Sequence, residues 1–349
     1  MMSADQLLTI RAIRTETPEV KTFMLEAPAG STLPSYQAGQ YLTLVHQVYG
    51  REVRRSYSIS SAPVLQEPLS ITVKRVENGL ISRRLIDHAQ PGDTLTTIGA
   101  AGFFTLPQDI DAFQQLVLVA AGSGITPVFS LLKTALFAHP HLRVLVLYSN
   151  RTPESAIFRE SLLALARQFP DRLHLELLFS NNPDLARARL YKELLEELVQ
   201  RYAPAPPQGT LAYLCGPLNF MRMATYGLHE IGLPLSHIRR EQFNPDAATV
   251  PHSIPPDTDA HQVLLRFRGQ EHRLQVQYPL TILQTARRQG LRLPYSCEAG
   301  QCGQCAAYCT AGQVWMAVNE VLTDRETALG LVLTCTGYPI GSADVQLDM

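Results

Sequence analysis

The C-terminal third of the chain contains the stretch Cys297-Glu298-Ala299-Gly300-Gln301-Cys302-Gly303-Gln304-Cys305, and Cys335 follows at the end of a later apolar run. This C-x4-C-x2-C spacing with one distant cysteine is typical of a plant-type 2Fe–2S site. Three thiolates on one short loop surround two irons only where the backbone turns tightly, which Gly300 and Gly303 allow because glycine reaches positive φ without steric cost. Zinc motifs usually place their cysteines in two separate C-x2-C pairs. The stretch therefore predicts a protein that moves single electrons, with metal ligands Cys297, Cys302, Cys305 and Cys335.

The composition describes a globular protein of more than one domain. A chain of 349 residues is too long for one ordinary core and suggests two or three domains. Hydrophobic residues make up 46% and charged residues 17%, which excludes a disordered chain. The formal net charge is −1 and no run of like charges occurs, so nothing favours a nucleic acid or an anionic membrane surface as partner.

The first residues, the lengths of the apolar runs and the cysteines predict a cellular location. Residues 1–6 lack a basic region followed by an apolar stretch, which argues against a signal peptide. No apolar run approaches the ~20 residues that a membrane helix needs. Cys215 and Cys309 have no evident disulfide partner, and free thiols together with an oxygen-sensitive cluster suit a reducing compartment. We therefore expect a cytoplasmic protein with no membrane partner.

The first hundred residues have the pattern of a small antiparallel β-barrel. Short β-like segments are separated by turns rich in glycine and proline, which is typical of such barrels. These segments are 8–10, 20–26, 41–45, 69–76 and 94–98.

From Leu116 onward the pattern changes to continuous apolar strands that alternate with helices. The strands are 116–120, 144–148, 173–179 and 211–215, and the helices are 128–138, 156–168 and 191–201. Continuous apolar runs are typical of buried parallel strands. The alternation predicts a doubly wound α/β sheet.

A proline-rich segment separates this sheet from the cysteine-rich part. Residues 244–259 contain four prolines and little apolar periodicity, which predicts a semi-rigid linker. Two β-like stretches, 263–268 and 271–276, and a helix over 281–289 precede the cysteine loop. We therefore divide the chain into a barrel domain (1–107), a nucleotide-binding domain (108–243), the linker (244–259) and a 2Fe–2S domain (260–349).

Two segments of the barrel carry side chains that suit a flavin. Arg55-Ser56-Tyr57-Ser58-Ile59-Ser60 ends a strand. An aromatic face stacks on an isoalloxazine ring, a hydroxyl hydrogen-bonds its N5, and an arginine neutralises phosphate. Read alone, the segment is equally an ordinary polar strand end. Ser82 begins a predicted helix over 82–88, and a helix N-terminus with a serine is a phosphate site, so the two segments reinforce each other.

The segment 121–127 has the context of a nucleotide loop. It follows a predicted strand, contains Gly122, Gly124, Thr126 and Pro127, and precedes a helix. Glycines let the backbone approach a pyrophosphate, and the helix N-terminus holds it. The alternative is a plain tight turn, which the strand–turn–helix order disfavours. Cys215-Gly216-Pro217 ends the fourth apolar strand, where ligands of doubly wound sheets bind, although a lone buried cysteine is more often a packing residue.

With these motifs in this order, the chain resembles the ferredoxin–NADP reductase superfamily with a C-terminal plant-type ferredoxin domain. Within it, the layout is most similar to the reductase subunits of phenylacetyl-CoA epoxidase systems. The resemblance covers essentially the whole chain. It implies an antiparallel β-barrel flavin domain, a doubly wound parallel-sheet nucleotide domain and an α+β domain of the β-grasp type.

The resemblance also implies roles for individual residues. Those that match the flavin motifs are Arg55, Tyr57, Ser58 and Ser82; those that match the nicotinamide-nucleotide motifs are Gly122, Gly124, Thr126, Pro127, Cys215, Gly216 and Pro217. It assigns the hydride-transfer position to Tyr57, Ser58 and Cys215. Glu241-Gln242-Phe243 is similar to the E-R-F ending of the reductase module, with Gln242 in place of arginine. Glu298 replaces the commoner arginine after the first cluster ligand.

The nucleotide preference is read from the end of the strand at 144–148. Arg151 follows it, and no acid is present to select a free ribose 2′-hydroxyl. An arginine accepts a 2′-phosphate, which favours NADPH over NADH. The next strand ends Ser180-Asn181, where NADPH-using relatives often have Ser-Arg, although Arg187 and Arg189 lie near in sequence. The resemblance alone favours FAD over FMN.

These observations predict an NAD(P)H-dependent oxidoreductase. We expect electrons to pass from NADPH through FAD to a 2Fe–2S cluster and on to a protein acceptor, an oxygenase component such as a phenylacetyl-CoA epoxidase. The alternatives are an NADH-dependent reductase for another acceptor, such as a ring-hydroxylating oxygenase or a desaturase, and a redox-sensing nucleotide-binding module without turnover. Docking surfaces leave no short motif, so the sequence selects no acceptor.

Overall fold

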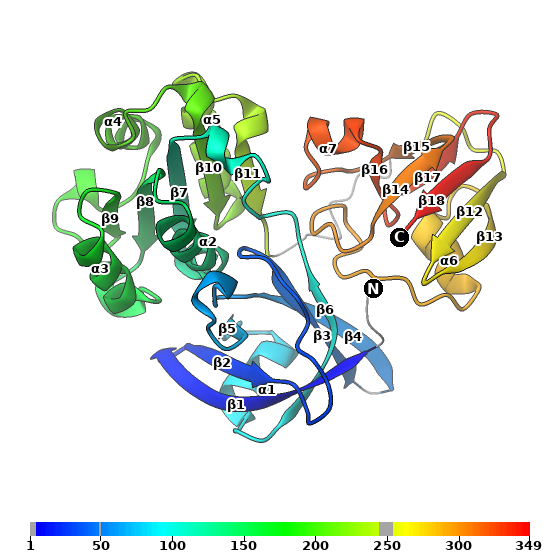
Figure 1. Ribbon diagram of the computed structural model, residues 1–349, viewed down its shortest axis with the longest axis horizontal. Helices are drawn as coiled ribbons and strands as arrows, with labels where there is room; N and C mark the ends of the chain where they lie inside the picture. Colours follow the sequence, from blue (N-terminus) through cyan, green and yellow to red (C-terminus); the bar gives the residue numbers. More distant parts are fainter. Residues whose placement is uncertain (1–4, 49, 244–253) are drawn as a thin grey trace. The chain divides into compact units, whose positions relative to one another are not determined.

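The computed structural model describes residues 5–48, 50–243 and 254–349 (Figure 1). The chain divides into two compact units, one with residues 5–100 and 104–241, the other with residues 101–103 and the chain from 242 onward. The predicted barrel and nucleotide domains both lie in the first unit. Residues 244–253 of the predicted linker lie outside the described residues, and the domain boundaries at 107, 243 and 259 stay predictions.

The first six strands form the barrel. They are β1 (Gln6–Thr17), β2 (Val20–Glu26), β3 (Tyr41–Val48), β4 (Arg51–Ser58), β5 (Ser70–Lys74) and β6 (Thr94–Ala101), in the order β4-β3-β6-β1-β2-β5. An antiparallel bridge between Ile59 and Ile71 joins the two outer strands. Apolar side chains at alternate positions, such as Leu8 and Ile10, fill the interior. Helix α1 (Leu80–His88) adds Ile81, Leu85 and Ile86 to this core.

The second part of this unit is a five-stranded parallel sheet. Its strands are β7 (Gln115–Ala121), β8 (Arg143–Asn150), β9 (Leu173–Phe179), β10 (Thr210–Cys215) and β11 (Ile238–Glu241), in the order β11-β10-β7-β8-β9. The chain begins in the centre at β7, runs outward to β9 and returns to the other side at β10. The neighbours β7 and β10 therefore define the topological switch point, where doubly wound sheets bind ligands.

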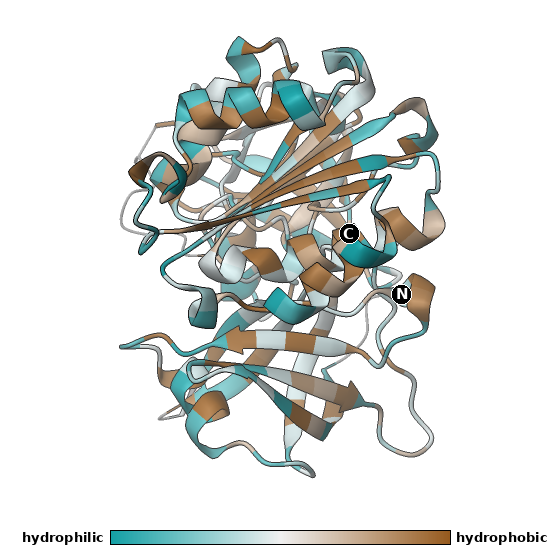
Figure 2. Cartoon of the chain, turned by 90° about the vertical axis from the view of Figure 1, so that its left-hand side faces the viewer, coloured by the Kyte–Doolittle hydropathy of each residue, from teal (hydrophilic) through white to brown (hydrophobic). Residues whose placement is uncertain are grey.

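Helices cover both faces of the parallel sheet. Helices α2 (Ile125–Ala138) and α3 (Arg159–Gln168) pack on one face, and α4 (Lys192–Tyr202) and α5 (Leu218–Glu230) pack on the other (Figure 1). The central strands are buried on both sides, as Leu116 and Val117 of β7 illustrate by facing opposite cores. Figure 2 shows these strands as mostly hydrophobic. This is why the sequence shows continuous apolar runs here.

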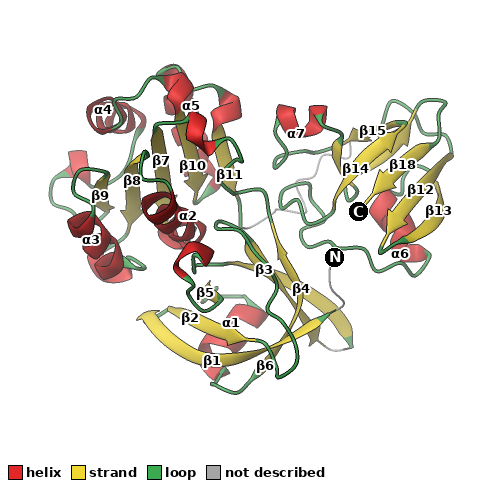
Figure 3. Cartoon of the chain, in the orientation of Figure 1, coloured by secondary structure: helices red, strands yellow, loops and turns green. Residues whose placement is uncertain are grey.

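The second unit contains the cysteine loop. Its strands are β12 (His261–Phe267), β13 (Gln270–Val276), β14 (Ala306–Ala311), β15 (Gln313–Met316), β16 (Leu331–Leu333), β17 (Gly337–Ile340) and β18 (Val345–Asp348). Five of them form one sheet in the order β13-β12-β18-β14-β16, and β15 pairs with β17. Helix α6 (Ile282–Arg288) packs Ile282, Leu283 and Ala286 into the core, and α7 (Asp324–Ala328) precedes β16 (Figure 3).

Most predicted elements are present, with shifted ends. The strand predicted over 20–26 coincides with β2, while α2 begins three residues before the predicted 128. Helix α3 starts at Arg159 rather than at 156, because Phe158 takes a left-handed conformation with φ 58° and ends a preceding turn. Helix α5, strand β11, helix α7 and the strands that follow the cysteine loop were not predicted. The remaining short 3₁₀ helices are η1 (Pro63–Leu65), η2 (Ile110–Ala112), η3 (Gly122–Gly124), η4 (Pro153–Ser155), η5 (Leu185–Arg187), η6 (Pro207–Gly209) and η7 (Leu235–His237).

Candidate functional sites: the junction of barrel and parallel sheet, and a cysteine loop

The predicted nucleotide loop lies at the carboxyl end of β7. Residues Gly122–Gly124 form η3, and Gly122 has φ 55°, which a glycine adopts without strain. Helix α2 follows at once, with Thr126 and Pro127 buried in its first turn. Within the described residues no side chain caps this N-terminus, so its amides suit an anion.

The loop packs directly against the end of β10. A Cβ atom at Gly124 would lie far inside van der Waals distance of the Cys215 carbonyl oxygen. A Cβ at Gly216 would lie 3.0 Å from the Cβ of Ala121. Both glycines are therefore required for the close approach of the β7 and β10 ends, and Pro217 follows as the residue before α5. The structure thus brings together the two motifs that the sequence placed about ninety residues apart.

Strand β11 places a carboxyl group beside the cysteine. It runs parallel to β10, and the register pairs Glu241 with Cys215. Burial raises the pKa of Glu241 to about 8, against the opposing effect of a hydrogen bond from Ser58. Burial, and then the charge of Glu241, raise the pKa of the Cys215 thiol well above its usual range. At neutral pH both groups therefore favour their protonated forms.

The barrel contributes the third member of this group. Ser58, at the end of β4, is buried, and its Oγ donates a hydrogen bond to Glu241 Oε2 at 3.3 Å. Ser58, Cys215 and Glu241 thus meet where the barrel contacts the carboxyl edge of the parallel sheet. The arrangement offers a hydroxyl, a thiol and a protonatable carboxyl in one place, which is chemistry suited to holding or moving a proton.

The other residues of the flavin motif line the barrel strand. Tyr57 is half-buried, and burial raises the pKa of its phenol well above the usual range, so the ring stays neutral. Arg55 is exposed, and its Nη1 donates to the Arg54 carbonyl oxygen at 2.7 Å. Along a strand, residues 55 and 57 share one face and residue 58 lies on the other. Their proposed contacts with a flavin stay predictions.

Two basic residues near Arg55, His46 and Arg84, were not identified from the sequence. Burial, and then the charges of Arg84 and Arg55, lower the pKa of His46. The buried Nε2 of His46 has no hydrogen-bond partner among the described residues. An unpartnered buried nitrogen near two guanidinium groups suits a phosphate, so these residues fit the anionic part of a flavin nucleotide.

Ser82 lies in the first turn of α1, which begins at Leu80 rather than at the predicted Ser82. Its Oγ accepts a hydrogen bond from Val76 N and donates one to the Gly79 carbonyl oxygen, both at 3.2 Å. The hydroxyl thus shapes the turn that leads into α1, whose N-terminus has no side-chain cap from any described residue. Its amides suit an anion, and the direct role of Ser82 stays a prediction.

Arg151 lies directly after β8 and is exposed. The following loop is held against it, because Asn181 N donates to the Arg151 carbonyl oxygen at 3.2 Å. Arg187, which the sequence offered as a second cation, pairs with Glu176 at 2.9 Å. Arg189, the other cation near in sequence, is exposed like Arg151, and the contact of Arg151 with a 2′-phosphate stays a prediction.

In the second unit, the four predicted cluster ligands come together. Cys297, Cys302 and Cys305 lie on the loop before β14, and Cys335 lies two residues beyond β16. The Cys297 thiolate accepts hydrogen bonds from Cys302 and Cys335, which lower its pKa. A hydrogen bond from Cys335 likewise lowers the pKa of Cys305. All four sulfurs are therefore linked by direct contacts.

The backbone around these sulfurs suits a cluster. Ala299 N and Gln304 N donate to the sulfurs of Cys297 and Cys302 at 3.4 and 3.5 Å. Gly300 has φ 73°, and a Cβ there would lie 2.5 Å from the Val318 carbonyl oxygen. In the part of the chain that the structure describes, no group of three or more histidine, cysteine, aspartate or glutamate side chains is arranged to hold a single metal ion. The fit to a 2Fe–2S cluster therefore rests on four contacting sulfurs, the donating amides and the glycine turns.

Two further residues lie beside the cluster loop. Glu298, the departure from the commoner arginine, pairs with Arg287 of α6 at 2.8 Å, and Arg287 lies 4.4 Å from the centre of the Tyr295 ring. The extra negative charge is therefore partly balanced. Cys309 lies in β14, where its Sγ contacts the Ala311 carbonyl oxygen at 3.3 Å, consistent with a packing role.

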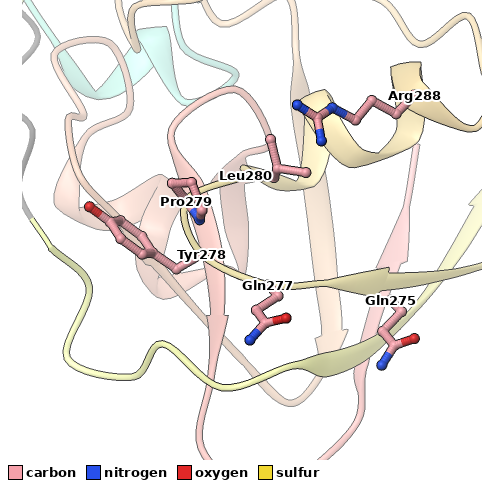
Figure 4. A pocket seen from close by; sticks show the side chains of 6 residues that line it. All are labelled: Gln275, Gln277, Tyr278, Pro279, Leu280 and Arg288. Atoms are coloured by element: carbon pink, nitrogen blue, oxygen red, sulfur yellow. The ribbon is translucent and has the colours of Figure 1, made fainter.

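A surface depression of about 440 Å³ also lies in the second unit (Figure 4). It is lined by Gln275 of β13, by Arg288 of α6 and by the segment Gln277–Leu280 between them. Its lining includes none of the residues predicted to bind a cofactor.

Among the described residues, no helix is both long and apolar enough to cross a lipid bilayer.

Glu241 is the main functional residue to which the sequence assigned no role. Its motif was noticed as the end of the reductase module, but nothing local connects it with Cys215 or Ser58. The signal that would have found it is the carboxylate at the end of a fifth, short parallel strand. Such strand ends meet at one edge of the sheet.

Three family models match the chain in order. They are an oxidoreductase FAD-binding domain at residues 8–106, an oxidoreductase NAD-binding domain at 118–225 and a 2Fe–2S iron–sulfur cluster binding domain at 265–339. Each contains the corresponding predicted site residues.

Relatives match over nearly the full length. A component of the 1,2-phenylacetyl-CoA epoxidase of Escherichia coli is 32% identical, covering 99% of this chain and 98% of the relative. The ferredoxin reductase component of the 3-ketosteroid-9-alpha-monooxygenase of Rhodococcus rhodochrous is also 32% identical, with 97% and 95% covered. The solved structure of phthalate dioxygenase reductase has a TM-score of 0.60 and 25% identity, covering 99% of this chain and 98% of that one. The chain therefore belongs to the family of FAD-, NAD- and 2Fe–2S-binding reductases that serve oxygenase systems.

Proposed function

We propose that this chain is an NADPH-dependent reductase that supplies electrons, one at a time, to the oxygenase component of a phenylacetyl-CoA epoxidase. The observation that carries the reductase assignment is that Ser58, at the end of β4 (hereafter the flavin strand, Arg51–Ser58), meets the pair Cys215 and Glu241 at the ends of β10 and β11. The full-length match to an epoxidase component supports the acceptor.

Tyr57, Ser58, Cys215 and Glu241 have distinct tasks in this proposal. A bound flavin would supply the conversion of a two-electron hydride into single electrons, and that chemistry would belong to the cofactors. Tyr57 would hold the flavin ring by its aromatic face, and Cys215 would position the nicotinamide. Ser58, whose Oγ donates to Glu241 Oε2, would connect the reactive edge of the flavin with that carboxyl. Glu241 holds a proton at neutral pH, because burial raises its pKa to about 8.

NADPH is favoured by Arg151. Its exposed guanidinium follows β8, and Arg187 is engaged by Glu176. An arginine binds a phosphate with two parallel hydrogen bonds, whereas a ribose hydroxyl offers no charge. A reducing cytoplasm suits this protein, because its four cluster thiolates must stay reduced to bind iron.

The test is a visible spectrum of protein purified without oxygen, recorded before and after NADPH and, separately, NADH. We expect flavin and cluster bands that bleach faster with NADPH. Bleaching only with NADH would contradict the nucleotide assignment. Bands that bleach with neither nucleotide would contradict the reductase assignment and favour a redox-sensing module.

The acceptor is tested by mixing the reduced protein with purified oxygenase components. We expect reoxidation of the cluster to be fastest with the phenylacetyl-CoA epoxidase oxygenase. The reductase component of a steroid monooxygenase is equally similar to this chain, so that oxygenase is the informative comparison. Faster reoxidation by the steroid oxygenase, or by a ring-hydroxylating oxygenase, would refute the proposed acceptor.

A further inference from the structure

Helix α2 carries the nucleotide loop at its start and a set of polar contacts with the barrel farther along. Ser130 and Lys133 are one turn apart on this helix, and Thr126 of the nucleotide motif lies one turn before Ser130. All three therefore share a face of the helix, and all three are buried. The same face of α2 therefore carries the nucleotide motif at its start and the residues that contact the barrel farther along.

The partners of Ser130 and Lys133 lie just after the flavin strand. Ser130 Oγ donates to the Ser61 carbonyl oxygen at 2.6 Å, in a fully buried contact. The Lys133 ammonium donates to Glu67 Oε2, and its side chain is only 7% exposed. Ser61 follows Ser58 by three residues. Helix α2, which begins at the nucleotide loop, is thus hydrogen-bonded to the segment that directly follows Ser58 of β4.

The barrel side of this contact is itself held in one conformation. Glu67 Oε2 also accepts a hydrogen bond from Ala62 N at 2.8 Å, which closes the loop around η1. Gln66, next to Glu67, takes a left-handed conformation with φ 53°, which is costly for a residue other than glycine. Ser61 Oγ accepts from Ser70 N at 3.0 Å and contacts Tyr36 Oη at 2.7 Å.

The helix side is equally constrained. The Lys133 ammonium lies 4.5 Å from the centre of the Phe129 ring, which in turn stacks on Phe158 at 4.4 Å. A nearly buried ammonium costs desolvation free energy, and a carboxylate partner offsets it only in good geometry. Such a pair adds little net stability, but it forms only when the two segments that carry it lie in one particular arrangement. This combination suits a contact that fixes register rather than one that stabilises the fold.

We propose that Ser130 and Lys133 are positioning residues for hydride transfer, which hold the nucleotide loop at a fixed distance from the flavin strand through Ser61 and Glu67. The inference rests on the proposed function, because it takes the flavin to lie at Tyr57 and Ser58 and the nucleotide at the start of α2. Hydride transfer is sensitive to this distance, since a misplacement of about 1 Å costs on the order of 100-fold in rate. Neither residue needs to touch either cofactor.

The test compares full-length S130A and K133M proteins with the wild type and with K192M. Lys192 pairs with Glu230 between α4 and α5, on the other face of the sheet, and serves as the matched control. The rate of flavin bleaching after anaerobic mixing with saturating NADPH is recorded by stopped flow. The amplitude of the long-wavelength charge-transfer absorbance of nicotinamide on flavin reports their stacking.

We expect S130A and K133M to keep their flavin content while bleaching slows by about 10-fold or more and the charge-transfer band weakens. The KM for NADPH should change less than kcat, and reduction of the cluster by dithionite should be unchanged. K192M should match the wild type. A purely stabilising role would lower Tm without altering the charge-transfer band.

Wild-type bleaching rates and charge-transfer bands in both variants would overturn the proposal. If K133M loses its flavin, S130A decides, because it removes one hydroxyl and leaves the ion pair in place. Recovery of the full rate in E67Q/K133M would also overturn it, since that variant lacks the pair but leaves no unpaired charge. Failure of the wild type itself to bleach with either nucleotide would refute the proposed function, and the positioning role with it.

Discussion

Replacing Glu241 with glutamine is the most direct test of the group formed by Ser58, Cys215 and Glu241. Burial raises the pKa of this carboxyl to about 8 from an ordinary 4.5. The folded protein therefore keeps a proton that the unfolded chain has released above pH 4.5. This contribution to stability is fully present below pH 4.5 and is lost as the pH rises toward 8. Glutamine keeps the shape and a hydrogen-bond acceptor for Ser58, and it does not titrate.

The size of the effect follows from linkage. From pH 6 upward the wild type should lose about 1.4 kcal/mol of unfolding free energy per pH unit through this group, and the loss becomes smaller close to pH 8, so that about 2 kcal/mol is lost between pH 6 and pH 8. The E241Q variant should lack that loss, so its advantage over the wild type should grow as the pH rises. Above pH 8 the difference should level off, because the carboxyl is then ionised in both states.

The assay is urea unfolding of the flavin-loaded protein, followed by release of flavin fluorescence at pH 6, 7, 8 and 9. Exposed Glu197 on α4 supplies the control substitution, E197Q, which should follow the wild type at every pH. The turnover rate with an artificial acceptor, plotted against pH, should change slope near pH 8 for the wild type and should not do so for E241Q. Parallel stability profiles for the wild type and E241Q would refute the assignment of a buried, protonated carboxyl.

Other substitutions test the remaining sites. C302S should lose most of the iron and the visible cluster bands while keeping flavin, whereas C309S should keep both, as measured by iron analysis and absorbance; full iron content in C302S would exclude Cys302 as a ligand. G124A should destabilise the first unit by about 1–3 kcal/mol in chemical denaturation and weaken nucleotide binding, because the added Cβ has no room beside the Cys215 carbonyl oxygen. The control G209A should stay within about 0.5 kcal/mol of the wild type, because a Cβ at Gly209 would meet only distant neighbours. R151A should lower kcat/KM for NADPH by about 10- to 100-fold and leave that for NADH nearly unchanged in steady-state kinetics; equal losses for both nucleotides would exclude a 2′-phosphate contact.

The sites that depend on short-range spacing could be predicted from the sequence. The three clustered cysteines and the two glycines between them lie within nine residues, so ligand spacing and backbone freedom are both visible in the sequence. The nucleotide loop could be predicted for the same reason. Its glycines, the preceding apolar strand and the following helix are all local features, and the β2 and β7 segments showed their burial directly in the residue pattern.

Contacts between distant segments depended on the tertiary structure. Glu241 pairs with Cys215 through the register of β10 and β11, and it meets Ser58 across 183 positions. The Lys133–Glu67 pair spans 66 positions, and nothing near either residue in the sequence marks the other. The sequence alone determined which cofactors the modules suit, because those motifs are local. Only the folded chain decided that Glu241 meets Ser58 and that Lys133 meets Glu67, because strand order and packing bring those groups together.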